Sequence, residues 1–163
     1  MMNPIASLAP AIKDLATTQK SSFATTQAVW RFLNNENVSF HQLNQPIEKL
    51  VFDQVAQLKH KYILVAHDWS QLQYVKHDNK INRIKRTHAN DLSYELQSSL
   101  LVDAEQGLPI APIAQTLSDS TGRYSTFDDQ FADPETHLNA LMQQIDYIEA
   151  MPIEQKMVHI IDC

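Results

Sequence analysis

The chain has 163 residues, of which 44% are hydrophobic and 20% are charged, and its formal net charge is −6 at pH 7. This composition is typical of a globular protein with one domain, or with a small domain and part of a second. Its two glycines are too few for a glycine-rich phosphate loop, and its lone cysteine excludes both an internal disulfide and a cysteine zinc site. The negative charge argues weakly against a nucleic-acid partner, although a local basic strip can still contact phosphates.

The first residues carry no sign of a targeting or membrane segment. Residues 1–15 lack a basic start followed by a long apolar run, so they do not read as a signal peptide. No stretch approaches the roughly 20 apolar residues that a membrane helix needs. We therefore expect a cytoplasmic protein without a membrane partner.

Helical patterns dominate the first third of the chain. Residues 5–19 read as a short helix, residues 20–26 as a polar turn or cap, and residues 27–35 as a second helix. Pro46 is expected to start a further helix over residues 47–60, with apolar side chains recurring on one face. The sequence thus predicts a helical head over residues 1–58.

Strand patterns follow in residues 59–163. Residues 62–68 form a short apolar run typical of a buried strand, and residues 72–75 begin a second extended piece. Residues 93–119 read as a β-hairpin with its turn at Glu105–Gly107 and with Pro109 and Pro112 at an edge or bulge. A polar loop, a helix opened by Pro134 and a last apolar strand complete an α/β order of strand, hairpin, helix and strand.

An aspartate closes each of two apolar strands. Asp68 ends the run YILVAHD, and Asp162 ends VHIID. Ligands and metals gather at strand ends in α/β sheets, and two adjoining carboxylates would repel each other unless a cation lay between them. Hard oxygen ligands suit Mg²⁺ or Mn²⁺, which support phosphoryl transfer. An aspartate after an apolar strand is also a common turn former or helix cap, and the pattern alone leaves both interpretations open.

Four segments resemble the cut-and-paste DDE transposases of bacterial insertion sequences, in the group of the enzyme from the kanamycin-resistance composite transposon. AVWRFLNNENVS is similar to a segment before the catalytic domain of that group, and ILVAHDWSQLQY to the strand with its first catalytic aspartate. LQSSLLVDAEQGLPIAPIAQTL resembles the hairpin that follows, and VHIIDC the strand with the second aspartate. His67 departs from the family, which more often has an acidic residue there.

The resemblance implies a helical DNA-binding region over residues 1–58, here possibly shortened, and the first half of an RNase H-like catalytic domain over residues 59–163. It implies Asp68 and Asp162 as catalytic residues and ligands of two Mg²⁺ or Mn²⁺ ions. It implies transposon-end and target DNA as partners, and a homodimer for the intact family. The family's third acid, a glutamate on a later helix, has no counterpart in these residues, so we expect a truncated and inactive transposase.

Basic residues are the candidate DNA contacts. Residues 76–88 form the most basic part of the chain and read either as a solvated face or as a phosphate-contacting strip. Arg31 could equally contact DNA or form a salt bridge, whereas its neighbours Trp30, Phe32 and Leu33 are expected in a core. The candidate DNA-binding residues are Arg31, Lys76, Lys80, Arg83, Lys85 and Arg86.

The remaining polar residues give weaker signals. The spacing of the histidines matches no zinc signature, so we expect them to be solvated or incidental. Glu95, Asp103 and Glu105 are expected on the surface of the hairpin, where one of them could substitute poorly for the missing acid. Two other functions stay open: a non-catalytic DNA-binding or inhibitory protein derived from a transposase, and an unrelated interaction domain.

Overall fold

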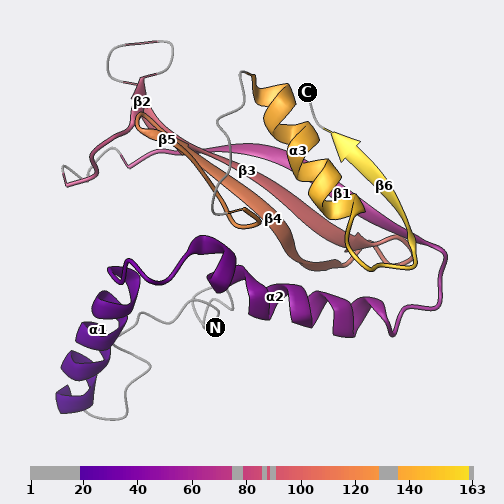
Figure 1. Ribbon diagram of the computed structural model, residues 1–163, viewed down its shortest axis with the longest axis horizontal. Coiled ribbons are helices and arrows are strands. Elements are labelled where there is room, and N and C mark those ends of the chain that lie inside the picture. Colours follow the sequence, from indigo (N-terminus) through magenta and orange to yellow (C-terminus); the bar gives the residue numbers. More distant parts are fainter. Residues whose placement is uncertain (1–18, 75–78, 86–87, 89–90, 129–135, 162–163) are drawn as a thin grey trace, which may run out of the picture. The chain divides into compact units, whose positions relative to one another are not determined.

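The computed structural model describes residues 19–74, 79–85, 88, 91–128 and 136–161, with only the backbone described for 19–23 (Figure 1). The chain divides into two compact units, Met1–Ser39 and Phe40–Cys163. The domain boundary predicted from the sequence lies later, at residue 58. Residues 40–58, which the sequence analysis grouped with the helical head, thus belong to the same compact unit as the sheet.

Helix α1, Gln19–Leu33, belongs to the first unit. The polar residues 20–26, predicted as a turn, are helical instead, which shows that their weak local preference for a turn did not stop the helix. Trp30, Phe32 and Leu33 were expected in a core, but their side chains are 65%, 48% and 66% exposed. The expectation was wrong because helical spacing of apolar residues identifies a face without supplying a partner for it.

The second unit is built on a mixed sheet in the order β5-β4-β3-β1-β6, with β2 paired to β3 off this path. Strand β1 lies between an antiparallel neighbour, β3, and a parallel neighbour, β6. The predicted α/β class is therefore confirmed, as is the order of strand, hairpin, helix and strand. The strands are β1 (Tyr62–Leu72), β2 (Ile84–Lys85), β3 (Leu92–Asp103), β4 (Pro109–Asp119), β5 (Gly122–Ser125) and β6 (Lys156–Ile161).

The predicted hairpin is present as β3 and β4. Asp103 Oδ1 accepts hydrogen bonds from the backbone N–H groups of Glu105 and Gln106, which fixes the turn, and Gly107 takes φ +67°. The register of the pair shifts opposite Pro112 and Pro109, as expected for residues that cannot donate to a ladder. The segment after β4, predicted as a loop, contains strand β5, because residues 116–119 of β4 pair with it.

Two helices pack with this sheet. Helix α2, Phe40–Val55, begins six residues before Pro46, so the prediction that Pro46 starts it was wrong. Helix α3, His137–Glu149, begins after the N-cap Thr136, whose hydroxyl accepts from the Asn139 N–H. Its side chains reach β3, β4 and β6, so α3 covers one face of the sheet (Figure 1).

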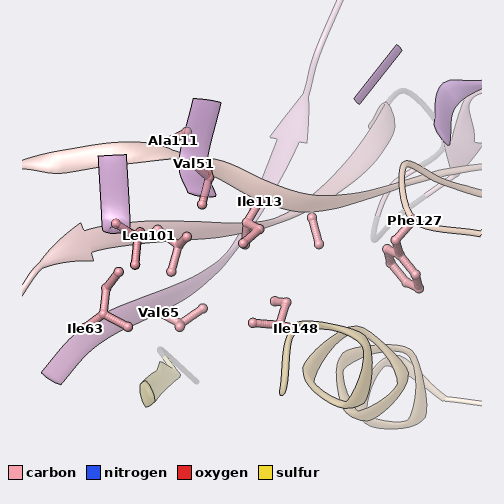
Figure 2. Packing of buried hydrophobic residues seen from close by; sticks show 10 residues of the cluster. Val51, Ile63, Val65, Leu101, Ala111, Ile113, Phe127 and Ile148 are labelled. Atoms are coloured by element: carbon pink, nitrogen blue, oxygen red, sulfur yellow. The ribbon is translucent and has the colours of Figure 1, made fainter. Parts of the chain in front are cut away.

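The core joins both helices to the sheet. Val51 and Val55 of α2, Ile148 of α3 and buried side chains of β1, β3 and β4 form one cluster (Figure 2). A hydrogen bond from Tyr147 Oη to Glu48 Oε1, 2.5 Å long, also links the two helices. Burial and the nearby carboxylate raise the pKa of Tyr147 because both disfavour a second negative charge. Within the described residues, no helix is both long and apolar enough to cross a membrane.

Candidate functional site

Asp68 lies seven residues into β1 and is exposed, although its neighbours Val65 and His67 are buried. Its Oδ2 accepts a hydrogen bond of 2.7 Å from the hydroxyl of Ser70, two residues further along the strand. Side chains two residues apart share a face of a strand, so Ser70 holds one side of the carboxylate and leaves the other side accessible. An exposed carboxylate with one fixed oxygen is a competent ligand for a hard cation.

Asp162, the second predicted catalytic residue, lies outside the described residues. The strand before it, β6, is parallel to β1, and the register pairs Ala66 with Ile160 and His67 with Ile161 (Figure 1). Asp68 and Asp162 are the next residues in the sequence after this last pair. The two predicted acids therefore follow the same register position on adjacent parallel strands.

A pocket of about 500 Å³ opens where β6 ends beside β1. Two acids, one histidine and four apolar or aromatic side chains form its wall: Asp68, Trp69, Glu95, His137, Leu138, Leu141 and Ile161. The strands supply the acids and α3 supplies His137, Leu138 and Leu141, so the first turns of α3 form one side of the pocket. Its size suits a small ligand or the end of a larger one.

Glu95 is a second acid in this pocket, and it was expected on the hairpin surface. Its side chain is 8% exposed, and its Oε1 lies 2.9 Å from Nδ1 of His137, the first residue of α3. Burial of the carboxylate is tolerated because it gains a hydrogen-bonding partner that can carry a positive charge. The expectation was wrong because side chains along β3 alternate between the two faces of the sheet. The odd-numbered residues from 93 to 103 lie on the face that α3 covers.

Asp68 and Glu95 belong to opposite faces of the sheet. The β1–β3 register pairs His67 with Ser99 and Gln71 with Glu95, so Glu95 shares the face of His67, while Asp68 shares that of Ser70. Both line one pocket, whose wall also includes Ile161, the last residue of β6. Asp68 and Glu95 therefore line the same pocket from opposite faces of the sheet.

His67 belongs to a buried polar network that joins β1, β3 and β6. It is 2% exposed, its Nδ1 lies 2.8 Å from Ser99 Oγ, and its Nε2 lies 2.7 Å from Nδ1 of His159. His159 Nε2 in turn lies 2.8 Å from Glu149 Oε1 at the end of α3. Burial, and secondarily the neighbouring His159, lower the pKa of His67 to about 4, so its imidazole is neutral at pH 7.

His60 is another histidine that the sequence did not predict to be engaged. Its Nε2 lies 3.3 Å from Asp103 Oδ1, and its Nδ1 lies 3.4 Å from Glu105 Oε2. Hydrogen bonds from the Glu105 and Gln106 backbone, with a smaller contribution from His60, lower the pKa of Asp103. This cluster lies at the β3–β4 turn. Of the acids predicted in the hairpin, Glu95 lines the Asp68 pocket and Glu105 does not. No sequence signal identified these pairs, because both depend on residues from separate elements.

The candidate DNA contacts divide into three groups. Lys80 and Lys85 are exposed, with Lys80 Nζ 5.0 Å from the ring centre of Tyr74, and Arg31 is exposed on α1 of the first unit. Arg83 is half-buried, and its Nη1 donates to the Tyr74 carbonyl at 3.3 Å, so it also has a structural role. Lys76 and Arg86 lie outside the described residues.

The known proteins compared with this chain give no family assignment: no family model matches it, and no curated protein does. Within the described residues, no group of three or more histidine, cysteine or acidic side chains is placed to hold a metal ion. The geometry around Asp68 therefore has to be interpreted from its own chemistry.

Proposed function

We propose that this chain carries the first two catalytic aspartates of an insertion-sequence DDE transposase, which acts on transposon-end DNA with Mg²⁺ or Mn²⁺. The observation that carries this proposal is the parallel register of β1 and β6, which pairs His67 with Ile161 one residue before each predicted acid. Two aspartates that serve only as turn formers have no reason to follow the same register position on adjacent strands.

The topology of the second unit also supports an RNase H-like domain. A central strand with an antiparallel hairpin on one side and, after a helix, a parallel strand on the other is the order expected for that fold. The pocket at Asp68 lies at the strand end where ligands of α/β sheets bind.

The donor chemistry at Asp68 fits a divalent metal. A carboxylate oxygen is a preferred ligand of Mg²⁺ and Mn²⁺, and the Ser70 hydroxyl orients this carboxylate. Such ions, when bound, would stabilise negative charge on the attacking and leaving oxygens of a phosphodiester. Asp68 and Asp162 would hold them, and the Asp68 pocket would receive the DNA end.

A second candidate function, DNA binding without cleavage, is favoured by the state of Glu95. This acid shares the pocket, but it is paired with His137 and faces the other side of the sheet from Asp68. It is therefore poorly placed to act as a third metal ligand, while the exposed Lys80 and Lys85 remain suited to phosphate contacts.

Manganese binding by the full chain tests the proposed site. We expect Asp68→Asn to weaken Mn²⁺ affinity about tenfold or more, as loss of a charged ligand costs on the order of 1.5–3 kcal/mol. Asp53→Asn, at an exposed acid of α2, serves as the matched control and leaves the affinity unchanged. Equal affinities in the wild type and both variants, measured by electron paramagnetic resonance of free Mn²⁺, would overturn the metal site.

DNA binding can be followed separately by fluorescence anisotropy at several salt concentrations. We expect the double variant Lys85→Gln, Arg86→Gln to bind DNA more weakly and with a smaller dependence on salt. A protein that contacts fewer phosphates releases fewer counterions from the DNA when it binds. An unchanged salt slope would identify residues 76–88 as a solvated face.

A further inference from the structure

A chain of side-chain hydrogen bonds crosses the sheet next to Asp68. It runs from Thr116 on β4 through Gln144 on α3, Ser99 on β3, His67 on β1 and His159 on β6 to Glu149 at the end of α3. Thr116, Ser99, Gln144 and His67 are each at most 2% exposed, so water does not compete for these contacts. We call this chain the Thr116–Glu149 relay.

The direction of the relay is fixed at one end by a backbone carbonyl. Gln144 Nε2 lies 3.2 Å from the carbonyl oxygen of Ala114, which can only accept, so the amide nitrogen must face it. Gln144 Oε1 then accepts from the Thr116 hydroxyl at 3.0 Å, and Nε2 also donates to Ser99 Oγ. Ser99 is therefore an acceptor towards Gln144.

The other end of the relay is fixed by the Glu149 carboxylate, which accepts from His159 Nε2. Three contacts remain between these ends: Ser99 to His67, His67 to His159, and His159 to Glu149. If the Ser99 hydroxyl donates to His67 Nδ1, His67 carries its proton on Nε2 and donates it to His159 Nδ1. In the described part of the chain, the Ser99 hydroxyl proton has no acceptor other than His67 Nδ1.

We propose that the Thr116–Glu149 relay is a positioning device that holds His67 and His159 as Nε2–H tautomers and thereby fixes β6 against β1 beside Asp68. Ser99 donates to His67 Nδ1, His67 Nε2–H donates to His159 Nδ1, and His159 Nε2–H donates to Glu149. The opposite order would leave the Ser99 proton without an acceptor and would set His159 Nε2, as an acceptor, against a carboxylate. The buried Ser99 hydroxyl would then bear the desolvation cost of an unmade hydrogen bond.

The relay links each element that surrounds the pocket. His67 precedes Asp68 on β1, His159 lies on the strand that leads to Asp162, and Gln144 and Glu149 lie on α3, whose first turns line the pocket. The rings of His67 and His159 are also stacked, with centroids 5.1 Å apart and planes at 11°. The proton order stands on these contacts alone, whereas the claim that the relay positions a metal ligand rests on the proposed function.

Nitrogen spectra of the ¹⁵N-labelled full chain near pH 7 test the proton order directly. We expect Nε2 of both histidines to resonate as a protonated, pyrrole-type nitrogen and Nδ1 as an unprotonated, pyridine-type nitrogen. An Nδ1–H tautomer or a charged ring at His67 or His159 overturns the relay. This measurement needs no variant, so it stands even if a substitution prevents folding.

Ser99→Ala removes the donor to His67 Nδ1, and Ser98→Ala is its matched control on the opposite face of β3. Only Ser99→Ala should average the two tautomers of His67, and it should also speed amide exchange at Ile160 and Ile161 about tenfold, since one buried hydrogen bond is worth on the order of 1 kcal/mol. Glu149→Gln keeps an acceptor and should preserve the His159 tautomer, whereas Glu149→Ala should not. Equal spectra for Ser99→Ala and the wild type overturn the relay.

Manganese affinity separates this inference from the proposed function. A weaker affinity in folded Ser99→Ala than in the wild type supports positioning of Asp68, and equal affinities in the two proteins overturn it. If the wild type binds no Mn²⁺, the proposed function fails, while the tautomers and the exchange rates still decide whether the relay fixes β6 against β1.

Discussion

The most unusual residue in the described structure is His67, a buried histidine directly before an exposed acid. Its two ring nitrogens both have partners, and desolvation holds its pKa at about 4, well below the ordinary value of 6.5. Protonation of this ring would bury a charge and break the contact with Ser99 or with His159. The folded state therefore depends on keeping His67 neutral.

This dependence predicts a loss of stability in mild acid. Between pH 6.5 and pH 4 the unfolded chain binds a proton at His67 that the folded chain does not, so the free energy of unfolding falls as the pH falls through this window. The free energy of unfolding should fall by about 3 kcal/mol in total, because the pKa of His67 differs by roughly 2.5 between the two states and one pKa unit corresponds to about 1.36 kcal/mol.

Urea unfolding of the wild type and His67→Gln at several pH values measures this loss of unfolding free energy. The wild type should lose more stability than the variant across this window, and His88→Gln, at an exposed histidine, should behave as the wild type does. Parallel curves for wild type and His67→Gln would mean that His67 can be charged in the folded state at little cost.

At the scale of elements, the β3–β4 hairpin organises the second unit. Its turn combines the Asp103 carboxylate, which accepts from two backbone N–H groups, with Gly107 in the left-handed region at φ +67°. The Gly107 N–H also donates to the Asp103 carbonyl at 2.9 Å. The turn thus sets the register that puts Glu95, Ser99 and Leu101 on the face covered by α3.

Gly107→Ala should destabilise the protein by about 1 kcal/mol, because a side chain disfavours the left-handed conformation. A Cβ atom at this position would meet no atom within 4 Å, so the cost comes from the backbone conformation and not from a clash. The midpoint of urea unfolding reports the change. Gln106→Ala, at the exposed neighbouring position, is the control and should have a much smaller effect; equal midpoints for the two variants would contradict the strained position.

At the scale of the whole molecule, apolar surface remains at the edge of the sheet. Strand β6 ends the described strand order, and its Val158, Ile160 and Ile161 side chains are 43%, 48% and 43% exposed. A short edge strand with apolar side chains and unpaired backbone groups is a template for association.

We therefore expect the chain to self-associate as its concentration rises, and Ile160→Lys to reduce this association by placing a charge on the edge strand. Sedimentation velocity over a range of concentrations measures it. Ile81→Lys changes an equally apolar residue, 70% exposed, outside the sheet, and it should leave the association unchanged. A wild-type chain that stays monomeric at every concentration would contradict the expectation.

Activity also belongs to the whole molecule. With Mg²⁺ or Mn²⁺ and DNA carrying transposon ends, we expect these 163 residues alone to produce no nicking above background, because the two aspartates of the proposed site would hold a second metal ion only loosely. Asp68→Ala is the control for any cleavage that does occur. Metal-dependent nicking that disappears in Asp68→Ala would prove the expectation wrong, and Glu95, which lines the Asp68 pocket, would then be the next acid to replace.

The sequence by itself determined the α/β class, the order of strand, hairpin, helix and strand, and the turn at residues 105–107, because these depend on local periodicity and turn chemistry. It also placed Asp68 at a buried strand, although β1 continues four residues beyond it. Local patterns misjudged Pro46 and residues 20–26, where helix formation outweighed the local signals for a cap or turn.

Only the tertiary structure decided which polar residues are buried and with which partners. The His67–His159 contact joins residues 92 positions apart, and Glu95 meets His137 through the first turn of α3. Neither pair has a spacing that a sequence pattern can indicate, because strand register and helix placement bring the residues together. A buried polar side chain is stable only where such a partner exists, and that partner is supplied by the fold as a whole.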